Sequence, residues 1–189
     1  MSYIRIEKNE TCEITEKKSR FIAYLAYVTT EEDAQSFVAQ IKKKHYDARH
    51  NVYAYILNSG GKKYSDDGEP SKTAGYPILE MLENEGVTDV VCVVTRYFGG
   101  TLLGTGGLIV AYRTAAADAI EHCKIETRLV EEKITYTFTY PMMNDVMKVV
   151  KDMQPRIISQ TFDNTCSITL SIRKSEAEAL RGRLAKLSF

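Results

Sequence analysis

Residues 87–112 of this chain read VTDVVCVVTRYFGGTLLGTGGLIVAY. The apolar run Val90–Val94 has the length and β-branched content of a buried strand, and it leads into two glycine clusters. Apolar residues then recur at helical spacing from Leu108 onward. The stretch therefore predicts a strand, a glycine-rich loop and a helix. Such a loop brings backbone N–H groups, the positive end of a helix and the side chain of Arg96 around one point, which favours binding of an anion.

The glycine loop departs from two familiar nucleotide-binding motifs. Gly99–Gly104 has the glycine spacing of a Walker A loop, but Thr105 stands where the lysine is required. Gly104–Gly107 begins like a dinucleotide fingerprint, but Ile109 takes the place of the third glycine. What remains is Thr105 as a helix N-cap and a first turn without side chains. That turn admits either an anion or closely packed backbone, and both interpretations stay open.

Composition indicates a soluble globular protein. The chain has 189 residues, enough for one large or two small domains, of which 44% are hydrophobic and 26% charged. No apolar run approaches the length of a membrane span, and the N-terminus does not read as a signal peptide, so we expect a cytoplasmic protein. The four cysteines form no CxxC pair and are interpreted as reduced, packed thiols. A formal net charge of zero removes any general argument for nucleic acid but leaves room for a local basic face.

The residues before the central stretch predict strands and one helix. Residues 12–28 suggest two strands around a charged turn, and a capping box of Thr29 with Glu32 predicts a helix over residues 31–44. A strand is expected over residues 51–57. A histidine on an apolar face, such as His50, is more often a hydrogen-bonded core residue than a catalyst, but its place at the start of this strand keeps it a site candidate.

Residues 58–76 are rich in Gly, Ser, Asp and Pro, and we expect them to form a long loop without regular structure. Asp66, Asp67 and Glu69 surround Gly68 and suggest a carboxylate cluster for a hard cation. The spacing fails the calcium-loop pattern, and turn chemistry alone explains it. We therefore expect no metal and no cofactor, and name these three acids as the residues that would hold a metal.

The remainder of the chain changes character after residue 126. The first element is an alternating strand, which we expect to bury Ile134, Tyr136, Phe138 and Tyr140. A helix over residues 146–153 follows, and then a hairpin that turns at Asp163-Asn164. The last element is a helix capped by Ser175 and Glu178. The order β-α-β-β-α is that of a ferredoxin-like split βαβ without its last strand, which we expect after Phe189. We expect domains over residues 1–126 and 127–189.

Four motifs carry a family resemblance. They are KSRF at 18–21, DARH at 47–50, SDDGEP at 65–70 with TAG at 73–75, and RYFGG at 96–100 with LGTGGL at 103–108. In this order they closely resemble the IMPACT/YigZ family, and the tail resembles the C-terminal domain of its bacterial branch. The resemblance implies an α+β protein. Its first domain would be a two-layer α/β domain of the small-subunit ribosomal protein five domain-2-like type, as in elongation factor G domain IV, and its second a ferredoxin-like domain, as in that factor's domain V.

The resemblance also implies a role in translation. Eukaryotic members act in translational control by competing for the activator of a starvation-responsive initiation-factor kinase. They carry an accessory domain that this chain lacks, so that partner does not transfer. We expect a binding protein that contacts RNA, the ribosome or a translation factor, with no membrane and no DNA sequence specificity. The candidate anion- or partner-binding residues are Lys18, Ser19, Arg20, Arg49, His50, Asp66, Asp67, Glu69, Thr73, Arg96, Tyr97, Gly99, Gly100, Gly104, Thr105, Gly106 and Gly107.

Two alternatives stay open. A metal-assisted hydrolase acting on a phosphorylated or peptide-like small molecule would use the three loop acids, with His50 as proton carrier and Arg96 to stabilise negative charge. A purely structural role would have Arg96 pair with Asp66 or Asp67. In every case we expect the SDDGEP loop and the glycine loop to meet beside Arg49 and His50.

Overall fold

The computed structural model describes residues 2–123, 125–163 and 165–187. The chain divides into two compact units, which we call the N-terminal and C-terminal units. The first spans Tyr3–Arg128, and the second comprises the residues from Leu129 onward together with Ser2. The domain boundary that we propose, after residue 126, lies beside this division. No helix in the described part of the chain is both long and apolar enough to cross a membrane.

The N-terminal unit is built on a five-stranded sheet in which every neighbouring pair of strands is antiparallel. In spatial order its strands are β2 (Glu10–Glu16), β3 (Ser19–Tyr27), β6 (Val90–Tyr97), β4 (His50–Ile56) and β5 (Lys62–Ser65). A separate two-stranded sheet pairs β1 (Ser2–Ile6) with β7 (Ile125–Leu129), which the sequence did not indicate. The central strand is β6, the strand predicted from the opening stretch.

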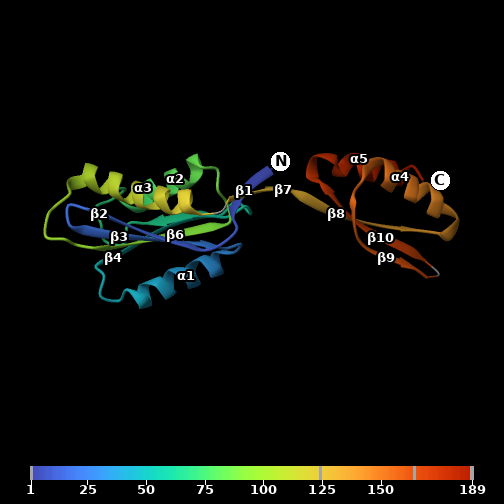
Figure 1. Cartoon of the computed structure of the whole chain (residues 1–189). Coiled ribbons are helices and arrows are strands. Elements are labelled where there is room, and N and C mark those ends of the chain that lie inside the picture. The colour runs from blue at the N-terminus through green and yellow to red at the C-terminus, as the bar shows by residue number, and fades with distance from the viewer. Residues whose placement is uncertain (1, 124, 164, 188–189) are drawn as a thin grey trace. The chain divides into compact units, whose positions relative to one another are not determined.

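Helices cover both faces of the large sheet (Figure 1). One face packs on α1 (Glu31–Lys44), the other on α2 (Gly75–Asn84) and α3 (Gly104–His122). The two faces of β6 supply both cores: Val91 and Val93 point toward α1, whereas Cys92 and Val94 point toward α2 and α3. The α+β class is confirmed, but the unit has three layers rather than the expected two. The unbroken apolar run of β6 accounts for the third layer. A strand without polar alternation is apolar on both faces, so each face has to be covered by helices.

Several local predictions need correction. The expected loop over residues 58–76 contains β5 and the start of α2. Helix α1 has the predicted bounds, but its N-cap is Thr30, whose side chain accepts a hydrogen bond from the N–H of Asp33. Helix α3 begins at Gly104, so Thr105 is not its N-cap. The N-cap is Leu103, which offers no side-chain hydrogen bond.

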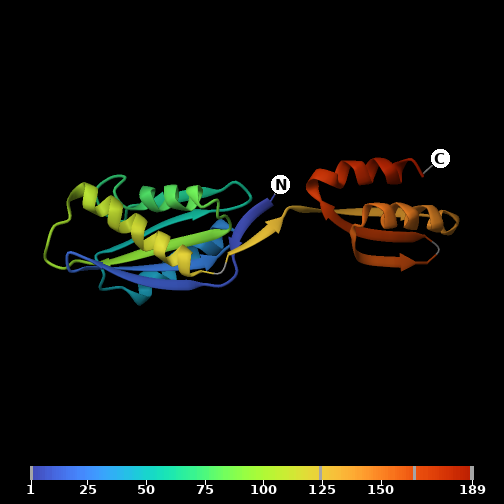
Figure 2. The same ribbon diagram turned by 45° about the horizontal axis from the view of Figure 1, so that its top comes forward.

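The C-terminal unit follows the predicted order β-α-β-β-α. Its elements are β8 (Glu131–Phe138), a short 3-10 turn η1 (Tyr140–Met142), α4 (Met143–Met153), β9 (Arg156–Phe162), β10 (Cys166–Arg173) and α5 (Lys174–Ala185). The strands form an antiparallel sheet in the order β8-β10-β9, and Figure 2 shows both helices on one side of it. A core of residues such as Phe138, Val146 and Leu180 joins these layers.

Three predictions in this unit have different outcomes. The antiparallel pairing of β9 with β10 is confirmed, although Asn164 of the predicted turn lies outside the described residues. Tyr140 is 72% exposed because the chain leaves the strand before it and enters η1. Helix α5 starts at Lys174 with Arg173 as N-cap, so the predicted cap at Ser175 is wrong. The strand expected after Phe189 lies outside the described residues.

Candidate functional site

Three strand ends of the N-terminal unit bring the candidate residues together. Antiparallel pairing places Arg96 of β6 directly between Phe21 of β3 and His50 of β4. The loop after β5 folds back over this point, and its Glu69 reaches both Arg96 and His50. The expectation that the two loops meet beside Arg49 and His50 is confirmed, since all these side chains except Phe21 line one cavity of about 250 Å³.

The centre of the site is a buried ion pair between Arg96 and Glu69. Arg96 Nη1 donates to Glu69 Oε1 over 2.6 Å, and the two side chains are only 8% and 4% exposed. The hydroxyl of Tyr112, from α3, donates to the same oxygen over 2.8 Å, while Nε2 of His50 lies 3.9 Å from Glu69 Oε2. Burial, followed by the charge of Glu69, raises the pKa of Tyr112, so its hydroxyl remains a donor. The partner of Arg96 is thus Glu69, not Asp66 or Asp67.

A turn between β2 and β3 is locked against the glycine loop. Lys17 and Lys18 form its tip with φ of +45° and +66°. The buried Ser19 hydroxyl accepts a hydrogen bond from the N–H of Gly99 over 3.2 Å. A Cβ on Gly99 would lie 2.0 Å from the carbonyl carbon of Lys18, so only glycine fits. Ser19 and Gly99 therefore fix the position of the neighbouring lysines.

The two aspartates of the SDDGEP loop hold its backbone. Asp66 Oδ1 accepts from the N–H groups of Ala74 and Gly75, and its Oδ2 accepts from the N–H of Lys72. The Asp66 carboxylate thereby caps the start of α2. Asp67, at φ +42°, accepts from Lys42 Nζ over 2.6 Å.

The loop is also tied to β4 and to its own end. Asp67 Oδ2 accepts from the N–H of Asn51, and the Asp67 carbonyl accepts from Nδ1 of His50 over 2.8 Å. The buried Thr73 hydroxyl donates to the carbonyl of Pro70 over 2.6 Å. These bonds make the loop an ordered wall of the cavity.

A second polar network, on the α1 face of the sheet, was missed by the sequence reasoning. The Tyr24 hydroxyl lies 2.6 Å from His45 Nε2, Nδ1 of His45 lies 2.8 Å from the Tyr97 hydroxyl, and that hydroxyl donates to Asp47. Burial, then the charge of Lys44, lowers the pKa of His45. Tyr97 thus fixes the end of β6 from the side of the sheet that α1 covers. The sequence did not indicate a structural role for His45, because this residue follows three lysines at the end of α1.

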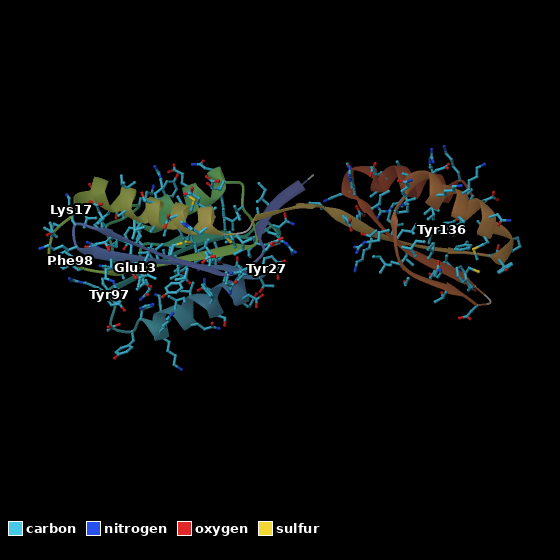
Figure 3. All side chains as sticks on the ribbon, in the orientation of Figure 1. Glu13, Lys17, Tyr27, Tyr97, Phe98 and Tyr136 are labelled. Atoms are coloured by element: carbon cyan, nitrogen blue, oxygen red, sulfur yellow. The ribbon has the colours of Figure 1, made fainter. Side chains whose placement is uncertain are left out.

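The exposed part of the site is basic and apolar. Lys17, Lys18, Arg20 and Arg49 are exposed, and among the described residues Arg49 has no recorded ion-pair partner. Phe98 is 51% and Leu102 83% exposed. Figure 3 shows Lys17 and Phe98 at the same end of the N-terminal unit. We call these six side chains, together with the first turn of α3, the loop surface.

Three cavities surround the loop between β6 and α3. The cavity beside Arg49 shares Leu102 with one of about 270 Å³ that reaches Gly104 and Thr105. The latter shares Leu103 with a third of about 310 Å³, lined also by Glu16, Lys17, Gly106 and Gly107. Because no side chain caps α3, its first N–H groups at the exposed Gly104, Thr105 and Gly106 are open to an external acceptor.

Arg96 itself does not present a free positive charge. Its guanidinium is neutralised by Glu69 and lies 5.6 Å from the ring centroid of Phe21 and 5.7 Å from that of Phe98. Among the residues described, its Nε is a buried donor with no hydrogen-bond partner. Arg96 therefore acts from within by bracing the exposed ring of Phe98, while the accessible cations are Lys17, Lys18, Arg20 and Arg49. Of these, Arg20 is paired with Glu13 over 2.7 Å.

Comparison with known proteins places the chain in a family. Residues 17–120, which contain every site residue that the sequence predicted, match the Impact N-terminal domain. The chain is also 34% identical over 189 residues to the IMPACT family member YvyE of Bacillus subtilis, covering 99% of this chain and 87% of that one. The chain belongs to the IMPACT family. Within this family, the Protein IMPACT homolog of Dictyostelium discoideum is 43% identical over 97 residues, which are 48% of this chain and 28% of that protein.

One solved structure is similar to this chain over almost its whole length. It is a crystal structure of a hypothetical protein with 30% sequence identity and a TM-score of 0.69, covering 99% of this chain and 93% of that one. The family's expected motifs at KSRF, DARH, SDDGEP and RYFGG are the four segments that converge at the site described above.

Proposed function

We propose that this protein is a cytoplasmic, translation-related binding protein whose loop surface contacts the phosphate backbone of RNA, either on the ribosome or in free structured RNA. The family resemblance supports the link to translation, because eukaryotic members act in translational control. The contact with RNA is argued from the site.

One observation carries the proposal: accessible cations and an exposed aromatic ring lie around an uncapped helix start. Lys17 lines one cavity with Gly106 and Gly107 of α3, and Arg49 lines another that shares Leu102 with the cavity at Gly104. With the exposed Lys18 next to Lys17, these cations and the uncapped N–H groups suit phosphate oxygens. Phe98, braced by Arg96, offers a ring on which an unpaired base can stack. Glu16 lines the same cavity as Lys17, and its negative charge reduces the positive potential there.

The geometry gives the hydrolase alternative little support. That reaction needs Asp66, Asp67 and Glu69 to converge on a metal or to exchange protons, yet each carboxylate is already engaged by partners that fix the fold. Among the described residues these three acids do not bring their oxygens together as a ligand group. The same bonds explain why the acids are present in a binding site that is meant to be rigid.

The proposal is tested by titrating a structured RNA with the full chain at several salt concentrations. Lys17, Lys18 and Arg49 would each neutralise one phosphate. At about −0.7 per phosphate, the slope of log K against log salt should be about −2 for single-stranded regions. Arg49→Ala should reduce this slope by about 0.7 and weaken binding to different RNA sequences by a similar factor.

Lys43→Ala is the matched control. Lys43 is exposed on α1, on the opposite face of the sheet, so its removal should leave the slope unchanged. Equal effects of the two variants would show that general charge rather than the loop surface attracts RNA. Absence of binding at low salt would refute the RNA contact itself.

A further inference from the structure

Three side chains with metal-binding atoms gather at the far end of α3 from the loop surface. Cys12 comes from the edge strand β2, whereas Asp118 and His122 share one face of the last turns of α3 because they are four residues apart. Each side chain offers one ligand atom, and these three atoms all lie within 4.8 Å of one another. It is the one such group found among the described residues.

We propose that Cys12, Asp118 and His122 form a binding site for a borderline-soft divalent cation of the Zn²⁺ class, with its fourth position open to water. Sulfur, imidazole nitrogen and carboxylate oxygen are the donor types that zinc takes in proteins, and three protein ligands with one open position is a common arrangement. Neither calcium nor magnesium fits a site with a thiol, because both prefer oxygen ligands.

The spacing of the three ligand atoms is close to that of a tetrahedral site, and a cation would replace the contacts that Cys12 and His122 now make with the Asp118 carbonyl. Metal–ligand bonds of about 2.0–2.3 Å in a tetrahedron place the ligand atoms about 3.3–3.8 Å apart. Nδ1 of His122 lies 3.6 Å from Oδ1 of Asp118, and it donates to the backbone carbonyl of Asp118 over 2.7 Å, so a bound cation would replace this hydrogen bond. The sulfur of Cys12 lies 3.8 Å from the backbone carbonyl oxygen of Asp118, so the thiol is next to the same turn. Rotation of the half-buried Cys12 and the exposed His122 side chains closes the remaining distance.

The local electrostatics also favour a cation. The carbonyl groups at the C-terminal end of α3 carry partial negative charge, and Asp118 adds a full one. Burial, followed by the charge of Asp118, raises the pKa of Cys12, which opposes formation of the thiolate, so the thiol keeps its proton until a cation binds. Binding of M²⁺ would form the metal–sulfur bond and release this proton to solvent, and the two positive charges would balance the thiolate and the carboxylate.

The position of the site separates it from the proposed RNA contact. His122 and Gly104 are 18 residues apart on one helix, or about 27 Å at 1.5 Å per residue. A metal here would cross-link the edge strand β2 to the end of α3 without touching the loop surface. We therefore expect metal binding to raise the melting temperature of the protein and to leave RNA affinity unchanged.

The test uses the reduced, metal-free full chain titrated with Co²⁺, a spectroscopic substitute for Zn²⁺. The proposal expects one equivalent to produce intense tetrahedral d–d bands together with a thiolate-to-cobalt charge-transfer band, both abolished by Zn²⁺. Cys12→Ser should remove the charge-transfer band, and His122→Ala should weaken binding at least about 100-fold.

Cys123→Ser is the matched control. Cys123 is next to His122 in sequence, but its thiol is directed at the carbonyl of Lys8, 3.3 Å away, so the cobalt spectrum should survive this substitution. Melting curves of the metal-free variants show whether each is folded; Cys12 is half-buried, so serine should be tolerated. Weak octahedral bands in the wild type, or a charge-transfer band that survives Cys12→Ser, would overturn the proposal.

Discussion

Replacement of Glu69 by glutamine tests whether the buried ion pair organises the site. The substitution keeps the shape of the side chain but removes the charge that neutralises Arg96. The Arg96 side chain is only 8% exposed, so its guanidinium would remain buried without a counter-charge. Glu69 also accepts the hydroxyl of Tyr112, so the same oxygen would lose strength in two hydrogen bonds.

The expected loss follows from breaking a buried pair on one side. Such changes cost about 3–5 kcal/mol because an uncompensated charge remains in the interior. The exposed pair of Glu13 with Arg20 provides the control, since its side chains are 42% and 52% exposed. Glu13→Gln should cost no more than about 1 kcal/mol, because solvent screens that pair.

The free energy of unfolding of the N-terminal unit can be measured for both variants by urea unfolding that is monitored by hydrogen exchange and mass spectrometry. Amides of β6 report on the N-terminal unit alone, so unfolding of the C-terminal unit does not confuse the result. A loss below about 1 kcal/mol for Glu69→Gln, or equal losses in both variants, would refute the view that this ion pair holds the loops together.

Three further predictions concern single positions. Gly99→Ala should destabilise the protein by about 2 kcal/mol or more in urea unfolding, because its Cβ would overlap the backbone of Lys18. Gly106→Ala is the control: the added Cβ meets no atom within 4 Å and lies in a helical turn, so this change should be neutral or stabilising by up to about 1 kcal/mol. The lowered pKa of His45 means that the unfolded state binds its proton more readily. Stability should therefore be fully present above about pH 6.5 and fall as the pH drops below it, and a His45→Gln variant should show a flatter pH profile between pH 7 and 5. Asp66→Ala should cost about 1–2 kcal/mol in the same unfolding assay through loss of the cap of α2, with Asp66→Asn losing less; equal losses would contradict the cap.

The sequence anticipated the elements with strong periodicity. Helix α1, the buried stripe of α3 that includes Leu108, Tyr112 and Ala115, and the order of the C-terminal elements all follow from apolar spacing. The third layer was missed because the two-layer expectation came from the family resemblance, although the run Val90–Val94 already indicated a strand buried on both faces. Caps were misplaced by one or more residues, since hydroxyl and acidic residues cluster near helix starts and their spacing does not select one.

The candidate site was predicted in its location but not in its electrostatics. The four motifs named residues that do converge, yet sequence distance gives no information on which acid pairs with Arg96. Glu69 was selected because its loop folds back over β6, a long-range arrangement set by Asp66 and Asp67 binding backbone N–H groups. The cluster of Cys12 with Asp118 and His122 had only one local signal, the i,i+4 spacing of its last two members.

Co-sedimentation with ribosomes tests the central claim most directly. The full chain, with Lys17, Lys18 and Arg49 intact, should travel with ribosomes through a sucrose gradient at low salt and be released as salt rises. A variant with all three replaced by alanine should remain at the top of the gradient while keeping the wild-type melting curve. A triple variant that travels with ribosomes as well as the wild type does would contradict the account, and so would wild-type protein that at low salt stays at the top and also fails to bind free structured RNA.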